Sequence, residues 1–195
     1  IGEGARREQE RMISQLGILN FQIQARDLDE EDDDTRKEIL RKSQGLSLRD
    51  VEALQVELPD AQHIGGMVEI NVKDIVPRPP EGAKINVMGA QPSYLKGTNL
   101  VLISGRRLTA LDEERVTQVA LVGRTVARDI FRTENVLGKR LRLGSVWVTI
   151  VGIVSDAAGE QDITIEGIDL RDRNRDIILP LRSARLRFDR KDQAP

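Results

Sequence analysis

The chain has 195 residues, of which 39% are hydrophobic and only 3% aromatic, and its 30 Lys and Arg against 32 Asp and Glu give a formal net charge of −2. This length is enough for one sizeable domain or two small ones with an aliphatic core, while the near-neutral charge and the few aromatic rings argue against nucleic acid as a partner. The absence of cysteine excludes thiol catalysis, Cys-ligated zinc and disulfides, but leaves the cellular compartment open.

The ends of the sequence indicate a piece of a longer protein. It opens at Ile1 without an initiating Met or a signal-peptide pattern. No stretch reaches the roughly 20 apolar residues that a membrane-spanning helix requires. We therefore expect the protein to continue outside this sequence.

The first predicted elements are a helix and a strand. Apolar residues recur on one side of residues 3–16, which predicts an amphipathic helix with Gly17 as its C-terminal cap. Residues 18–25 alternate as a half-buried strand, with Phe21 and Ile23 on the same face.

An acidic block follows, with seven carboxylates in the eight positions 27–34. A calcium-binding EF-hand loop is one alternative, and its first, third, fifth and twelfth places would be Asp27, Asp29, Glu31 and Glu38. The sixth place, which requires Gly for a sharp turn, holds Asp32. A solvated, self-repelling loop is therefore the preferred interpretation.

A second helix is predicted between Ser47, as its N-cap, and Pro59, which stops it. Its buried stripe is expected to consist of Val51, Leu54 and Leu58. The next elements are strands over 64–76 and 83–89, a helical turn over 91–96, a strand or loop over 100–104, a strand over 119–122 and a helix over 124–131. In that last helix, Val126, Ala127 and Ile130 are expected to face inward.

A β-hairpin is predicted next, and it is the strongest strand signal in the chain. Leu141 and Leu143 alternate with arginines, which is typical of a half-exposed strand. After the two-residue gap Gly144-Ser145, the nearly continuous apolar run 146–154 predicts a strand that is buried on both faces. A polar stretch over 155–175 then leads to a predicted strand over 176–181 and to a basic tail with Arg182, Arg185, Arg187, Arg190 and Lys191.

The sequence contains no convincing catalytic motif. His63 is the only histidine, so a histidine-rich metal site is impossible and a structural or surface role is favoured. Gly138-Lys139 resembles part of a phosphate loop, but Thr133 replaces the earlier Gly and Arg140 replaces the following Ser or Thr. We therefore predict no catalytic, cofactor-binding or metal-ligating residue and no cofactor in this domain, and leave the partner-binding residues unassigned.

Several short segments in order resemble one family, the MacB-like periplasmic core domain of FtsX-like ABC transporter permeases. They are Ile1-Gly2-Glu3-Gly4-Ala5 before the first helix, 46–54 with Leu58-Pro59, 87–90 with Pro92-Ser93-Tyr94-Leu95, Gly105-Arg106-Arg107-Leu108, 119–123, and 137–139 ahead of 151–154. Each segment is weak alone, but their order and spacing are specific, and together they cover nearly the whole chain. The acidic block 27–34 is longer than the family usually shows, and the family generally continues beyond the strand at 179–181.

The resemblance implies a non-catalytic domain on the periplasmic or extracellular face of a bacterial membrane. It implies that ATP is hydrolysed by a separate cytoplasmic ATPase domain or subunit, and that the domain passes the resulting movement to a substrate or a partner. The partners implied are a second permease copy, the ATPase and a periplasmic adaptor or substrate protein, with membrane contact through flanking helices.

The expected fold is α+β with two subdomains. A helix/strand, porter-like part would comprise 1–70 and 176–195, and a β-rich part, 71–175, would be inserted in it. Two other functions share the composition: a freestanding ligand-binding module of the cell surface, and a hydrolase that uses carboxylates.

Overall fold

The computed structural model describes residues 21–24, 35, 37, 41, 45–133, 135–156, 164–165, 168–169 and 172–188. The strands are β1 (Met67–Ile70), β2 (Ile75–Val76), β3 (Asn86–Ala90), β4 (Leu100–Gly105), β5 (Val119–Gly123), β6 (Arg140–Leu143), β7 (Val146–Asp156), β8 (Thr164–Ile165), β9 (Ile168–Asp169) and β10 (Asp176–Pro180). The helices are α3 (Leu48–Glu57), α4 (Pro92–Lys96), α5 (Ala110–Glu114), α6 (Arg124–Phe131), α7 (Leu181–Phe188) and the short 3-10 helix η1 (Arg173–Arg175). Within these ranges, each helix is too short or too polar to cross a membrane.

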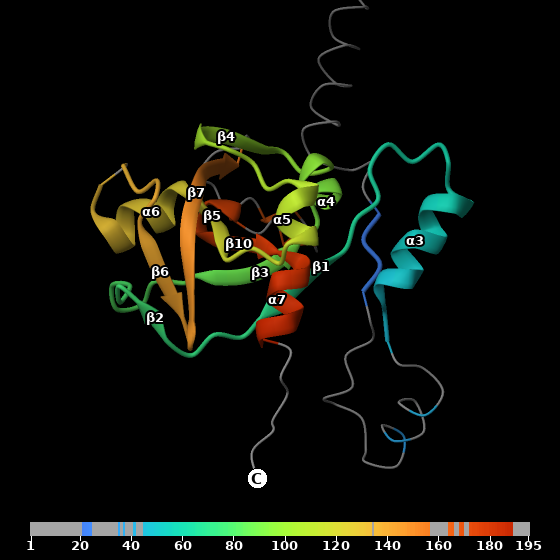
Figure 1. Cartoon of the computed structure of the whole chain (residues 1–195), viewed down its shortest axis with the longest axis horizontal. Coiled ribbons are helices and arrows are strands. Elements are labelled where there is room, and N and C mark those ends of the chain that lie inside the picture. Colours follow the sequence, from blue (N-terminus) through green and yellow to red (C-terminus); the bar gives the residue numbers. More distant parts are fainter. Residues whose placement is uncertain are drawn as a thin grey trace, which may run out of the picture.

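A mixed eight-stranded sheet forms the centre of the structure (Figure 1). Its order is β1-β3-β10-β5-β7-β6-β2, and β4 pairs with β7. The pairs β3–β10 and β5–β7 are parallel, and the remaining pairs are antiparallel. Helices pack against this sheet, so the α+β class predicted from the sequence is confirmed.

The sheet has a hydrophobic core on each of its faces, and strand β10 contributes to both. All five of its residues are buried. Ile177 and Leu179 belong to a core that includes residues of α6 and α7, whereas Ile178 belongs to a second core with Leu95 of α4. Because successive side chains of a strand point to opposite faces, the two cores lie on opposite sides of the sheet.

Helix α6 is also as predicted. Val126, Ala127 and Ile130 are buried in the first core. These residues lie at helical spacing and face the sheet, while Arg124 and Arg128 remain exposed.

The hairpin of β6 and β7 is confirmed, with one correction. Leu141 and Leu143 are fully buried, whereas Arg140 is exposed, as the alternation predicted. Strand β7 is buried on both faces only around residues 152–154, and its Trp147 is 42% exposed. The reason is that β5 pairs with β7 only from Thr149 onward, so the first residues of β7 lie beside β6 alone.

Helix α3 begins as predicted, but its expected buried stripe is wrong. The Ser47 N–H and hydroxyl both donate to the Asp50 carboxylate, at 2.6 and 2.8 Å, which fixes the first turn. No residue of the helix is buried, and Leu58 just after it is 51% exposed. In Figure 1, α3 lies to one side of the sheet, which explains why its apolar face has little to pack against.

Two predicted strands also differ from the structure. The single strand expected over 64–76 is two strands, because β1 pairs with β3 and β2 pairs with β6 at the opposite end of the sheet. The strand expected over 18–25 is not seen at 21–24, where the chain is irregular and Phe21 is 98% exposed. The predicted helix over 3–16 and the acidic block 27–34 lie outside the described residues.

The division into two subdomains stays a prediction, and the strand pairing constrains it. Strand β10 was assigned to the helix/strand part, but it is hydrogen-bonded to β3 and β5, which were assigned to the β-rich part. The two predicted parts therefore share one sheet. The basic tail begins as helix α7, directly after Pro180, with Arg182 and Arg185 exposed.

Candidate functional site

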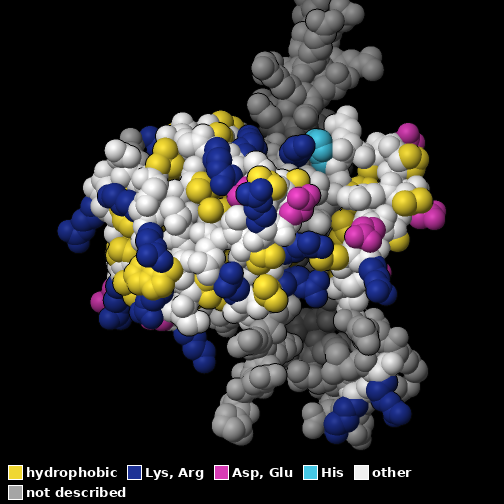
Figure 2. Space-filling model, in the orientation of Figure 1, with side chains coloured by type: hydrophobic (Ala, Val, Ile, Leu, Met, Phe, Trp, Pro, Cys, Tyr) yellow, Lys and Arg dark blue, Asp and Glu magenta, His cyan; other side chains and the backbone are white. Residues whose placement is uncertain are grey.

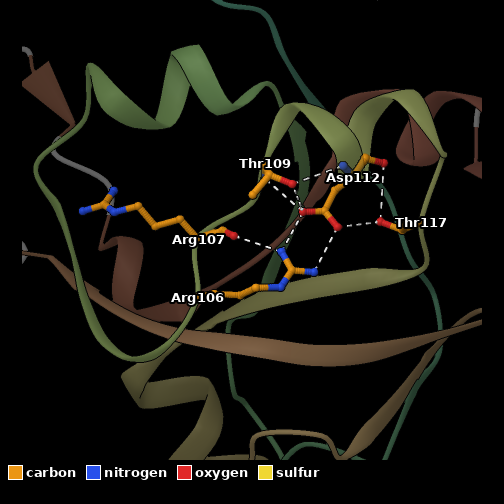
Figure 3. A network of polar contacts seen from close by, with 5 residues as sticks. All are labelled: Arg106, Arg107, Thr109, Asp112 and Thr117. Carbon is orange, nitrogen blue, oxygen red and sulfur yellow. Dashed lines mark hydrogen bonds and ion pairs between the residues drawn. The ribbon is translucent and has the colours of Figure 1, made fainter.

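The densest group of charged and polar contacts in the described residues surrounds α5, a helix of only five residues (Figure 3). Asp112 in its first turn contacts Arg106, which follows β4, and two threonines that flank the helix, Thr109 and Thr117. Arg107 extends away from this group and donates from Nη2 to the carbonyl oxygen of Leu100 at 3.1 Å. We call Arg106, Thr109, Asp112 and Thr117 the α5 cluster.

Both carboxylate oxygens of Asp112 are occupied. The guanidinium of Arg106 binds them in a two-pronged contact, with Nη1 to Oδ2 at 2.7 Å and Nη2 to Oδ1 at 3.0 Å. Oδ2 also accepts from the Thr109 N–H at 2.9 Å and from its hydroxyl at 2.8 Å. Oδ1 accepts from the Thr117 hydroxyl at 3.0 Å. The buried carboxylate is therefore fully satisfied by its own neighbours.

These contacts decide what the α5 cluster is able to do chemically. The hydrogen bonds from Arg106, more than those from the threonines, hold the pKa of Asp112 well below its usual range, although burial opposes them. A carboxylate that stays ionised and has no free oxygen is a poor general acid or base near neutral pH. The cluster is thus suited to fixing the end of β4 to α5, and not to catalysis.

Replacing Asp112 by Asn is expected to lower the free energy of unfolding by about 2 kcal/mol near pH 7, because hydrogen bonds to charged groups contribute about 1.5–3 kcal/mol. The pKa of Asp112 is lower in the folded than in the unfolded chain, so this stabilisation is complete above the unfolded value of about 3.9. It declines progressively as pH falls from there toward the folded value. Urea unfolding of both proteins at several pH values measures the difference. An equal difference at about pH 2.5 and at neutral pH would contradict the ion pair.

The residues that resembled a phosphate loop form a β-turn region instead. Gly138 has a φ of 76°, a conformation that favours glycine, and its N–H donates to the Ile150 carbonyl at 2.8 Å. Lys139 is exposed, and its Nζ lies 5.5 Å from the ring centre of Phe131. Strand β6 follows immediately, whereas a phosphate loop is followed by a helix whose N-terminus holds the phosphate.

His63 lies at the surface, as expected for a lone histidine. It lines an open hollow of about 330 Å³ between the end of α3 and α4, together with Ser93 and Lys96. No carboxylate lines this hollow, so the orienting group of a Ser-His-Asp triad is missing there.

A second concavity is too small for a ligand. It is an apolar pocket of about 30 Å³ between α4 and β4, roughly the space of one water molecule. Across the part of the chain that is described, no three His, Asp or Glu side chains converge as metal ligands. On the face shown in Figure 2, hydrophobic side chains occur in small groups among Lys and Arg, and no large apolar area is visible.

The α5 cluster was not predicted from the sequence, although a signal for it exists. Thr109 and Asp112 have the spacing of a capping box, in which an N-cap hydroxyl and the side chain three residues later satisfy each other's backbone N–H. The other member of the ion pair, Arg106, lies in the segment 105–108, which shares in the family resemblance.

Comparison with known sequences identifies a family and a relative. The sequence model of the MacB-like periplasmic core domain family matches residues 1–194. The macrolide export ATP-binding/permease protein MacB of Bdellovibrio bacteriovorus is 26% identical over 173 residues, which are 83% of this chain and 24% of that protein. The chain thus spans about a quarter of the length of this relative.

Solved structures with a similar fold include domains of two transporters. The periplasmic region of MacB from Actinobacillus actinomycetemcomitans superposes with a TM-score of 0.52 at 19% identity, over 74% of this chain and 59% of that one. The extracellular domain of the ABC-type transporter YknZ from Gram-positive bacteria also gives a TM-score of 0.52, at 16% identity, over 74% of this chain and 67% of that one. At these identities the likeness concerns the fold alone.

Proposed function

The chain belongs to the family of MacB-like periplasmic core domains, and from this membership we propose that it is the extracytoplasmic domain of an ABC transporter permease. The observation that carries the proposal is the family match over residues 1–194. The shared fold with extracytoplasmic domains of two transporters supports it.

The proposed role of the domain is mechanical and non-catalytic. ATP is hydrolysed by a separate cytoplasmic ATPase domain or subunit, and closure of that ATPase shifts the membrane helices that flank this domain. The domain passes the shift to a substrate or a periplasmic partner. A sheet with a core on each face supports this role, because a close-packed interior transmits strain.

The proposed partners follow from the same role. They are a second permease copy, the ATPase, and an adaptor or substrate protein outside the cytoplasm, with contact to the membrane through flanking helices. The near-neutral charge of the chain gives no reason to add nucleic acid.

Neither of the two other functions is favoured by an observation of the described residues. A carboxylate-based hydrolase needs a paired acid and base, but Arg106 holds Asp112 ionised. Both carboxylate oxygens of the neighbouring Glu113 accept from backbone N–H groups of α7. A freestanding binding module needs a ligand site, and neither the small apolar pocket between α4 and β4 nor the open, polar hollow beside His63 has the form of one.

The complete gene tests the proposal directly. We expect an apolar segment of about 20 residues immediately before Ile1 and another beyond this sequence. We also expect an ATPase with a phosphate loop, fused to the permease or encoded beside it. A gene without the apolar segment before Ile1 would contradict the permease role, and turnover of glycosides or esters by the purified chain would favour a hydrolase instead.

A further inference from the structure

Glu113, which follows Asp112 in α5, contacts helix α7, outside the α5 cluster. Its Oε1 accepts from the Leu181 N–H at 2.5 Å and its Oε2 from the Arg182 N–H at 2.9 Å. These N–H groups belong to the first turn of α7, where no carbonyl of the helix itself is available to accept from them. The preceding Pro180 carries no side-chain acceptor, so the local sequence does not cap this helix. Glu113 caps α7 from a distance of 68 residues along the chain.

The turn after α5 shows that this short helix is held firmly in place. Val116 has a φ of 51°, the left-handed conformation that is unfavourable for a β-branched residue. The Val116 N–H donates to the Glu113 carbonyl at 3.2 Å, and the Thr117 N–H donates to the Asp112 carbonyl at 3.0 Å. This is the Schellman pattern, in which the left-handed position usually holds Gly. Such strain persists only where surrounding contacts determine the conformation, and the α5 cluster supplies them.

We propose that Glu113 is a positioning residue that fixes the first turn of α7 to α5, and through the Asp112–Arg106 pair to the end of β4. Helix α7 then follows the sheet as one body. In Figure 1, α7 is the last labelled element before the C-terminus. The inference rests on the proposed function, which requires movement to pass between the domain and the segments that continue from its ends.

The contact of Glu113 with α7 is electrostatically less favourable than the neighbouring contact of Asp112 with Arg106. Burial raises the pKa of the Glu113 carboxyl, and the Arg182 and Leu181 amides and the Arg182 charge oppose this rise without cancelling it. The contact therefore holds an ionised carboxylate at some cost in solvation. By contrast, the neighbouring Asp112 is stabilised in its ionised form, so its contact with Arg106 is the more favourable of the two.

Hydrogen exchange of the chain tests the positioning role, with Glu113→Ala compared with Glu114→Ala. The control removes the same side chain from the same helix at an exposed position. In Glu113→Ala the amides of Leu181 and Arg182 are expected to exchange about tenfold faster or more, while the amide of Ile178 in β10 keeps its protection. Glu114→Ala is expected to match the unsubstituted chain at all three amides, and Glu113→Gln, which keeps one acceptor oxygen, to fall between them.

Two results would overturn the positioning role. One is unchanged exchange at Leu181 and Arg182 in Glu113→Ala. The other is an equal loss of protection at Ile178, since this indicates general destabilisation and not release of α7.

The role of Glu113 in transport is tested in the full-length permease with its ATPase. The measured quantity is the ratio of substrate moved to ATP hydrolysed. Glu113→Ala is expected to lower this ratio while ATP hydrolysis continues, and Glu114→Ala to leave it unchanged. If the domains of the unsubstituted transporter move with ATP but Glu113→Ala keeps the full ratio, the role of Glu113 in transmission is refuted and the proposed function stands. If the domains do not move with ATP, the proposed function itself fails.

Discussion

Replacing Ile150 by Asp is expected to unfold the domain. Ile150 is fully buried in the core that joins β5, β7 and α6, and its backbone is hydrogen-bonded to Gly138 and Lys139 on one side. A carboxylate at this position would be desolvated without a partner, which costs several kcal/mol. Since domains are stable by only about 5–15 kcal/mol, most or all of the folded population would be lost.

The matched control for this change is Ile103→Asp. Ile103 lies in β4 and is 51% exposed, so the same substitution there should change the unfolding free energy by only about 0.5 kcal/mol. Circular dichroism and thermal unfolding of the two variants give the comparison. A cooperative transition for Ile150→Asp near that of the unsubstituted chain would show that the packing around β7 is not as described.

The second large effect is expected for Gly105→Ala, at the end of β4 next to Arg106. Gly105 has a φ of 83°, and a Cβ built on it would lie 2.2 Å from the carbonyl oxygen of Val151 and 2.9 Å from the Cα of Gly152. Both obstacles are backbone atoms of the neighbouring strand β7, so they are unable to rotate away as a side chain would. We expect this substitution to lower the free energy of unfolding by about 3 kcal/mol or more, because it adds backbone strain and overpacking.

Gly138→Ala separates these two causes. Gly138 has a similar φ of 76°, but nothing lies within 4 Å of its added Cβ. This substitution should therefore lower stability by only about 1–2 kcal/mol, the cost of a left-handed conformation in a residue with a side chain. Denaturant unfolding of both variants measures the difference, and equal losses would mean that β4 and β7 do not approach each other this closely at Gly105.

Much of the fold could be predicted because its signals are local. The alternation of Leu141 and Leu143 with arginines identified β6, and the spacing of Val126 and Ile130 identified the buried face of α6. Both patterns indicate which face of an element is apolar. The prediction is correct where that face packs against the core, as it does in β6 and α6.

The predictions failed where the outcome depends on distant parts of the chain. Leu58 has the spacing of a buried residue, but α3 has little of the described structure to pack against. Similarly, the run 146–154 is apolar throughout, yet the end of β7 that holds Trp147 lies outside the pairing with β5. Periodicity indicates an apolar face, but only tertiary contacts decide whether that face is covered.

The candidate site shows the same limit. The link between Thr109 and Asp112 has a local signature, the capping box, and the Arg106 pair lies within a few residues of it. The contact of Glu113 with α7 has no such signature, because its partners are backbone N–H groups, which every residue except proline carries. The sequence shows only that Pro180, before α7, has no side chain that could cap the helix. Contacts of this kind depend on topology, which here places α5 beside α7.

The proposed movement of the domain as a rigid body in response to ATP can be measured as a change in the distance between the two domains of the full-length transporter. This chain has no cysteine, so Ser145→Cys in the exposed β6–β7 turn gives a single spin-label site per domain once any cysteines in the rest of the transporter are replaced. Ser145→Cys with Gln118→Cys in the isolated chain gives an internal reference. We predict that the distance between the two copies changes between the nucleotide-free state and a state trapped with a non-hydrolysable ATP analogue, while Ile150→Asp abolishes the defined distance. An inter-domain distance that is the same in both nucleotide states would contradict the account.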